Sequence, residues 1–147
     1  MKNNKNEIQY SLSQLDKKYF EMVSNNSSYS SGLVNKFQKL LIKPLSDYTI
    51  EDMRLMVGQN VGLEFLIPIV MEVLEKNIFV EGDYYEGDLL MVTLQSDSSF
   101  WLSNLALYHT LLLLFEQNID NLFSLDTTDE IKSNLLGAYE RFKDLYK

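Results

Sequence analysis

Apolar residues recur every three or four positions along much of this chain, which is the spacing of one face of an α-helix. In residues 33–42 this pattern predicts a helix that Pro44 ends, because proline cannot continue the backbone hydrogen bonds. Thr49 is placed to cap the next helix, since its side chain can accept a hydrogen bond from the first turn. That second helix is expected to stop at Gly58 or Gly62.

The helical pattern continues through the second half of the chain. A proline inside a helix removes a hydrogen bond, so we expect the main run of the third helix to start near Pro68. Residues 89–94 fit a short helix or, equally, a buried strand. A long helix is predicted over residues 100–118, and the last helix is predicted to be capped by Asp126 or Thr127.

Two polar segments interrupt these helices. Residues 24–31 read SNNSSYSS and residues 81–88 read EGDYYEGD, and both compositions are typical of loops. The six glycines and two prolines of the 147-residue chain are too few for a turn-rich β-sandwich. We therefore predict an all-α protein, a single compact bundle of five to six helices, in one domain over residues 1–147.

Charge is distributed unevenly along the chain. The formal net charge is −8, made up of +4 over residues 1–43, −14 over residues 44–131 and +2 over residues 132–147. No lysine or arginine occurs from residue 77 to residue 131. This distribution predicts an acidic face that attracts a basic protein, and it argues against a general nucleic-acid-binding role.

The sequence contains no pattern typical of export or of a membrane. Residues 1–11 include no apolar run that resembles a signal-peptide core. The longest apolar stretch, residues 100–115, is shorter than the roughly 20 residues of a spanning helix. The chain has no cysteine, which excludes disulfides and thiolate zinc sites. We expect a cytoplasmic protein without a membrane partner.

The strongest candidate for a functional site is the segment 81–88, called here the acidic loop. It holds four carboxylates and two tyrosines: Glu81, Asp83, Tyr84, Tyr85, Glu86 and Asp88. Tyrosine supplies contact area at low entropic cost, and carboxylates beside it can meet lysine or arginine from a partner. We interpret these six residues as candidate contacts to a basic protein.

Three other interpretations of the acidic loop remain open. A calcium or magnesium site of the EF-hand type needs glycine at the sixth position and glutamate at the twelfth. Counted from Asp83, the glycine is fifth and the twelfth residue is Leu94. Paired carboxylates can catalyse glycoside hydrolysis, although no other feature indicates a sugar cleft. The loop can also be simply solvated, with Asp88 as the N-cap of the helix that follows.

No catalytic or nucleotide-binding motif occurs in the sequence. It lacks the glycine-rich phosphate loops, the nucleophile elbow of hydrolases and the paired-histidine zinc motif. His109 is the only histidine, so no second imidazole is available to share a metal ion. We predict no catalytic residue, no metal site and no cofactor, and we expect Trp101 to anchor the core.

Six blocks of this sequence form one ordered pattern: SLSQL (11–15), KPLSDYTIEDMRLMVGQ (43–59), GL (62–63), LIP (66–68), EGDYYEGDLL (81–90) and FW (100–101). Together they resemble the immunity proteins of contact-dependent growth inhibition (CDI) systems. The resemblance covers about residues 11–101, and the last third of the chain matches no pattern of the family. Glu86 and Ile78 stand where proline is commoner in the family.

The resemblance implies a small helical protein that binds the C-terminal toxin domain of the CdiA-type effector of its own system. It would block the active or substrate-binding surface of that toxin and would itself not be an enzyme. Such toxins are commonly nucleases with basic surfaces. The alternative is a small acidic adaptor or regulatory protein that binds some other basic protein.

The resemblance also implies that residues of the shared blocks are structural. They are Asp52, Arg54, Gly58, Gln59, Gly62, Pro68 and Trp101. Arg54 and Gln59 are expected to hold the turn between Gly58 and Gly62.

Overall fold

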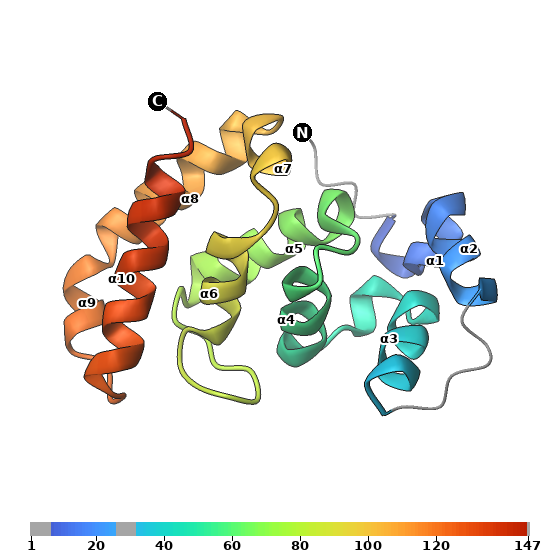
Figure 1. Ribbon diagram of the computed structural model, residues 1–147, viewed down its shortest axis with the longest axis horizontal. Coiled ribbons are helices and arrows are strands. Elements are labelled where there is room, and N and C mark those ends of the chain that lie inside the picture. The colour runs from blue at the N-terminus through green and yellow to red at the C-terminus, as the bar shows by residue number, and fades with distance from the viewer. Residues whose placement is uncertain (1–6, 26–31, 147) are drawn as a thin grey trace.

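The computed structural model describes residues 7–25 and 32–146, and the regular elements in them are helices apart from one isolated β-bridge (Figure 1). Two are 3-10 helices, η1 (Glu7–Gln9) and η2 (Leu45–Asp47). The α-helices are α1 (Leu12–Leu15), α2 (Lys17–Asn25), α3 (Gly32–Ile42), α4 (Ile50–Gly58), α5 (Leu63–Lys76), α6 (Asp88–Gln95), α7 (Ser98–Leu102), α8 (Leu105–Gln117), α9 (Ile119–Phe123) and α10 (Asp129–Lys143). The all-α class is confirmed, but the expected five to six helices are too few for the described part of the chain.

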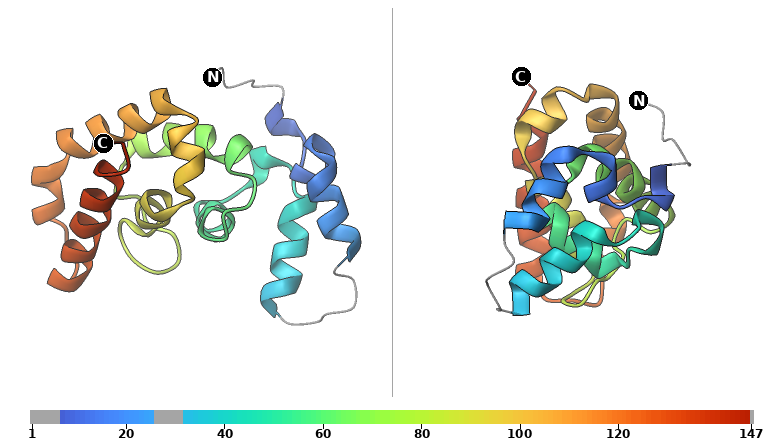
Figure 2. Two further views of the ribbon diagram at one scale, coloured as in Figure 1. Left: turned by 45° about the horizontal axis from the view of Figure 1, so that its top comes forward. Right: turned by 90° about the vertical axis from the view of Figure 1, so that its right-hand side faces the viewer.

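The helices follow one another across the molecule, from α1–α3 at one end, through α4–α6, to α8–α10 at the other (Figure 1). In the left view of Figure 2 they form an arch, with α3 and α10 as its two legs and the acidic loop between them. Neighbouring helices pack in series, α4 on α6 and α6 on α10. The helices are therefore arranged one after another along an arch and share one hydrophobic core.

Helix α4 begins where the sequence predicts. The Oγ1 atom of Thr49 accepts a hydrogen bond from the backbone N–H of Asp52 at 3.1 Å. The Asp52 carboxylate accepts one in return from the backbone N–H of Thr49 at 3.0 Å, which completes a capping box. The helix ends at Gly58, one of the two predicted stops. The segment 89–94 lies within α6, so the helical alternative is the correct one.

Pro68 does not begin a helix but lies inside α5, and the prediction of a start near it is wrong. The proline removes one backbone hydrogen bond and costs roughly 3 kcal/mol in a helix interior. Six buried side chains of the same helix outweigh that cost, since each contributes about 1.5–3 kcal/mol on burial. They are Leu63, Leu66, Ile67, Val70, Met71 and Leu74.

The helix predicted over residues 100–118 is interrupted, so α7 and α8 replace it. At the break, the Nδ2 atom of Asn104 donates to the backbone carbonyl of Phe100 at 2.8 Å and satisfies one carbonyl at the end of α7. The last helix is capped by Thr128, whose Oγ1 accepts from the backbone N–H of Ile131 at 3.2 Å. Its cap thus lies just after the predicted Asp126 or Thr127.

The loop predicted over residues 24–31 is described only at its start. Residues 24 and 25 belong to α2, and residues 26–31 lie outside the described residues. No helix in the described part of the chain is long and apolar enough to cross a membrane.

Helix α10 packs on α6 and reaches the end of the acidic loop. Gly87, the residue before α6, has φ = +91°, a left-handed conformation that favours glycine. A Cβ atom at this position would lie 2.9 Å from Cδ1 of Leu135 on α10. Backbone conformation and close packing therefore both require glycine here.

Candidate functional site

The acidic loop joins α5 to α6, and its two ends are held together. Glu81 and Glu86 form the isolated antiparallel bridge. The backbone N–H of Gly87 donates to the carbonyls of Phe79 at 3.0 Å and Val80 at 3.3 Å. The loop lies below α6 and next to α4 in Figure 1. The sequence predicts a loop over residues 81–88; the structure shows that residues 81–87 form a closed, hydrogen-bonded loop and that Asp88 is the first residue of α6.

Asp88 organises this loop from the inside. The residue is only 2% exposed. Its carboxylate accepts hydrogen bonds from the backbone N–H groups of Gly82 at 2.7 Å, Tyr84 at 3.0 Å and Tyr85 at 3.4 Å. Of the six candidate contact residues, Asp88 thus serves the loop's own structure rather than presenting a charge at the surface.

Glu51 and Arg54 of α4 hold the outer part of the loop. The Oε1 atom of Glu51 accepts from the backbone N–H of Asp83 at 3.0 Å and from Nε of Arg54 at 2.7 Å. The Nη2 atom of Arg54 lies 2.5 Å from Oε2 of Glu51. The Arg54 guanidinium also lies over the Tyr84 ring, within cation–π range. One ion pair therefore anchors both the backbone and the aromatic side chain of the loop.

This ion pair is largely shielded from solvent. The Glu51 side chain is 11% exposed and the Arg54 side chain is 18% exposed. Hydrogen bonding from Arg54 lowers the pKa of Glu51, and the same contact raises the pKa of Arg54. Both groups consequently stay charged, and the anchor persists over a wide pH range.

The loop presents three of its other candidate residues outward. Glu81, Asp83 and Tyr84 are exposed, and Tyr84 is 68% exposed. Tyr85 and Glu86 are half-buried, and burial raises the pKa of Tyr85. Among the described residues, no lysine or arginine forms an ion pair with Glu81, Asp83 or Glu86. The loop surface is therefore negative and aromatic, while the wider acidic face stays a prediction.

Asp52 makes contacts that connect two helices. It belongs to the capping box of α4, and it also accepts a hydrogen bond from Nζ of Lys43 at 2.6 Å. Burial alone would raise the pKa of Asp52, but the hydrogen bonds from Lys43 and Thr49 outweigh burial and lower the pKa. Asp52 thus joins the start of α4 to the end of α3.

The connection from α4 to α5 contains three of the expected structural residues. A Cβ atom at Gly58 would meet Val92 of α6 at 3.6 Å, an ordinary contact. The backbone N–H of Gln59 closes α4. Gly62 precedes α5 with φ = +72°, and a Cβ atom there would lie 2.8 Å from Cδ1 of Leu12. Both the backbone conformation at Gly62 and its close packing against Leu12 therefore favour glycine.

Arg54 does not hold this turn, because its side chain points to Glu51 and Tyr84 of the loop region. That expectation is corrected. Trp101 is confirmed as a core anchor, since it is fully buried and its Nε1–H donates to Oγ of Ser96 at 2.8 Å. Its ring meets that of Phe142 edge to face, with centroids 5.0 Å apart.

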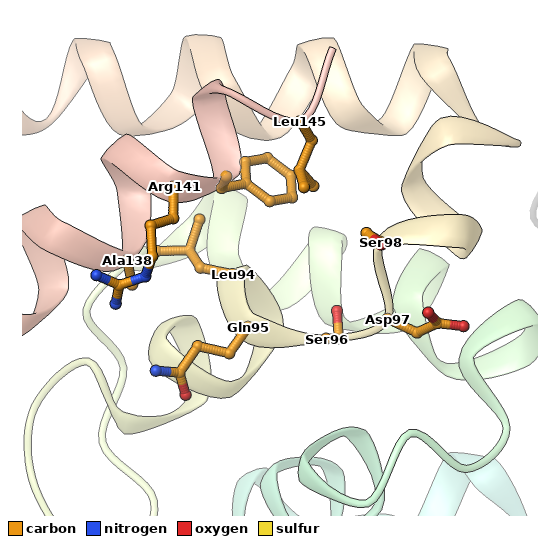
Figure 3. Close-up of a pocket in the computed structure, with 9 residues that line it drawn as sticks. Leu94, Gln95, Ser96, Asp97, Ser98, Ala138, Arg141 and Leu145 are labelled. Carbon is orange, nitrogen blue, oxygen red and sulfur yellow. The ribbon is translucent and has the colours of Figure 1, made fainter.

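A hollow of about 310 Å³ lies between the α6–α7 connection and α10 (Figure 3). Leu94 and Leu145 face it from opposite sides, and Ser96 and Ser98 line its edge. The carboxylate of Asp97, also at this edge, is engaged by the N–H and hydroxyl of Ser99. The hollow therefore brings no pair of free titratable groups together and has no arrangement typical of a catalytic site.

Across the described residues, no three histidine, cysteine, aspartate or glutamate side chains are placed to hold a metal ion. In the acidic loop the reason is visible in the geometry. The carboxylates of Glu51 and Asp88 point to backbone N–H groups, while Asp83 and Glu81 face solvent.

Sequence reasoning missed the contribution of Glu51 to the site. The spacing of Glu51 and Arg54, three residues apart on a helix, is typical of a side-chain pair. That spacing contains no sign that the pair reaches Asp83, which is 32 positions further along the chain.

Comparison with known proteins identifies the family. The family of CDI immunity proteins matches residues 7–111, which reach from η1 into α8 and include the acidic loop. Comparison with curated proteins and comparison with solved structures each gave no match. Because the match covers more than two thirds of the chain and includes the loop with its anchor on α4, this protein belongs to the family of CDI immunity proteins.

Proposed function

We propose that this protein binds the C-terminal toxin domain of the effector of its own CDI system and neutralises it by covering the active or substrate-binding surface. We further propose that the toxin is a basic nuclease, that binding occurs in the cytoplasm, and that the immunity protein acts by binding alone. The main support is the acidic loop, whose outward carboxylates have no basic partner among the described residues.

The chemistry of the loop suits a nuclease surface. A nuclease binds phosphates with lysine and arginine, and these same side chains can bind carboxylates. Glu81, Asp83 and Glu86 offer carboxylates beside the exposed ring of Tyr84. Complementary charge also speeds the encounter of two proteins, so an inhibitor of this kind captures its toxin rapidly.

The anchoring of the loop adds to affinity. A flexible loop loses side-chain and backbone freedom on binding, at about 0.5–1.5 kcal/mol for each immobilised side chain. Here Asp88 and Glu51 already hold the backbone, and Arg54 supports the ring of Tyr84. Much of that loss therefore occurs on folding, before the toxin arrives.

The proposal is tested with the C-terminal toxin domain of the effector from the same CDI system. The double variant Glu81→Lys with Asp83→Lys reverses two exposed charges of the loop. The matched control, Glu21→Lys with Glu140→Lys, makes the same change of net charge at exposed positions on α2 and α10. Dissociation constants are measured by calorimetry, and protection is measured as growth of cells that express the toxin.

We expect the loop variant to bind at least about tenfold more weakly than the control and to protect poorly. Circular dichroism checks that both variants remain folded. Equal binding and equal protection by the two variants would remove the acidic loop from the interface. Failure of the unaltered protein to bind the toxin would contradict the proposed function itself.

A further inference from the structure

Helix α8 is apolar on the side that packs and also on the side that faces solvent. Its buried residues are Tyr108, Leu111 and Phe115, and the helix packs on α5 and α10. On the outer side, Leu113 is 55% exposed, and Ala106 is exposed as well. A helix that is apolar all round is normally buried on every side. Within the described part of the chain, the outer side of α8 is therefore an uncovered apolar surface.

This surface also differs in charge from the rest of the protein. The chain has a net charge of −8, yet residues 98–115 contain no lysine, arginine, aspartate or glutamate. Two copies of an acidic protein repel each other wherever their carboxylates approach, and an uncharged face avoids that repulsion. A basic toxin, in contrast, finds no opposite charge on this stretch. Charge therefore favours a second copy of this chain, and not the toxin, as the occupant of this surface.

The outer residues of α8 are arranged for an antiparallel pair of helices. Ala106, Thr110 and Leu113 follow one another at four- and three-residue steps, so they lie on one stripe. A twofold axis near Thr110 makes Leu113 of each copy face Ala106 of the other, and a large side chain then meets a small one. The Thr110 hydroxyl already donates to the carbonyl of Ala106 at 2.8 Å, so covering it leaves no donor unsatisfied. The stripe is therefore complementary to itself.

The charges beyond the two ends of the stripe fit the same arrangement. The Tyr108 hydroxyl donates to the backbone carbonyl of Lys143 at 2.8 Å, which places the exposed Lys143 beside the first half of α8. Asp120, which is also exposed, belongs to α9 just beyond the other end of α8. An antiparallel pair brings the basic end of each copy toward the acidic end of the other. It also opposes the two helix dipoles, which is the favourable orientation.

We propose that α8 is the interface of a homodimer, in which two copies pair antiparallel through Ala106, Thr110 and Leu113. Helix α8 lies along the upper edge of the arch and the acidic loop lies below α6, so the two surfaces are separate (Figure 2). Both loops of the dimer thus stay accessible, and one dimer can hold two toxin domains. Because the contact is centred on one helix of each copy, its area is small and the dissociation constant falls in the micromolar range.

The test uses the whole protein without any toxin, so its outcome is independent of the proposed function. Analytical ultracentrifugation measures the average mass from low to high micromolar concentration. The variant Leu113→Glu places a carboxylate in the interface. The matched control is Ile42→Glu, which makes the same change on α3 at a side chain of similar exposure, 58%. Circular dichroism checks that both variants remain folded.

Cysteine crosslinking tests the register of the two helices, and the chain has no cysteine of its own to interfere. The variants Ala106→Cys and Leu113→Cys are mixed under mild oxidation, and each is also oxidised alone. Ile42→Cys, oxidised at the same concentration, measures crosslinking by random collision.

We expect the average mass of the parent protein to approach twice that of the single chain, and Ile42→Glu to behave in the same way. Leu113→Glu should dimerise at least about tenfold more weakly, because the interface would bury an unpaired charge. The mixture of Ala106→Cys with Leu113→Cys should crosslink faster than either variant alone. The inference is overturned if the parent stays monomeric over the whole range, if the two glutamate variants behave alike, or if the mixture crosslinks no faster than Ile42→Cys.

Discussion

The guanidinium carbon of Arg54 lies 4.4 Å from the centroid of the Tyr84 ring. This contact joins a residue of α4 to the most exposed aromatic side chain of the acidic loop. Since Arg54 also binds Glu51, which holds the loop backbone, a single side chain on α4 influences both the position and the order of the loop.

Replacement of Arg54 by alanine should therefore loosen the loop. The change removes the ion-pair partner of the shielded Glu51 carboxylate, and we expect a loss of about 1–3 kcal/mol in the free energy of unfolding. Urea denaturation measures this loss, and hydrogen exchange should show faster exchange at the N–H of Asp83. Arg141→Ala, at an exposed position on α10, is the control and should change stability by less than about 0.5 kcal/mol. Equal losses in the two variants would contradict the anchoring role.

Replacement of Asp88 by asparagine tests the internal support of the loop. The two side chains have the same shape, but the amide provides one neutral acceptor where the carboxylate accepts from three backbone N–H groups. We expect the free energy of unfolding to fall by about 1–3 kcal/mol. Asp83→Asn, at an exposed position of the same loop, should be close to neutral. The measurement is thermal denaturation of both variants. Similar melting temperatures for the two variants would contradict the role of Asp88 as the internal support of the loop.

The lowered pKa of Glu51 predicts a dependence of stability on pH. The unfolded value is about 4.3, and the folded value lies below it because of the hydrogen bond from Arg54. The stabilisation is therefore complete well above the unfolded pKa and is lost as the pH falls through the folded pKa. Glu51→Gln should lower stability near neutral pH and flatten its decline between about pH 6 and about pH 3. Glu140→Gln, at an exposed site, should keep the parent's slope; the measurement is urea denaturation at each pH.

Two glycines allow a matched test of backbone conformation. Gly62 has positive φ and faces Leu12, so Gly62→Ala should reduce the free energy of unfolding by about 1–3 kcal/mol. Gly32 begins α3, and nothing lies within 4 Å of a Cβ atom built there. Gly32→Ala should therefore be neutral or stabilise by up to about 1 kcal/mol. A loss of stability in the Gly32 variant as large as in the Gly62 variant would contradict this explanation.

The sequence was sufficient for features that depend on nearby residues. Thr49 and Asp52 are three positions apart, so their capping box follows from the sequence pattern. The helical class follows from apolar spacing in the same way. Pro68 led to a wrong prediction of where α5 begins, because proline disfavours the interior of a helix. The burial of the apolar side chains of α5 outweighs that preference, and this burial is visible only in the folded structure.

The candidate site was predicted less completely than the helices. Composition alone identified the acidic loop, but it did not distinguish the outward Asp83 from the buried Asp88. That difference depends on which carboxylate the loop folds around, and on Glu51 from another helix. Contacts between distant positions leave no periodic pattern in a single sequence, so the anchor of the loop had to be seen in the structure.

The contact between Gly87 and Leu135 has a consequence for engineering. Leu135 belongs to α10, which follows the region that matches the family. Its side chain nevertheless packs against Gly87, the last residue before α6. A graft of residues 81–88 onto another member of the family would leave this support behind. To transfer the loop in its present shape, a designer would have to move α10 together with it.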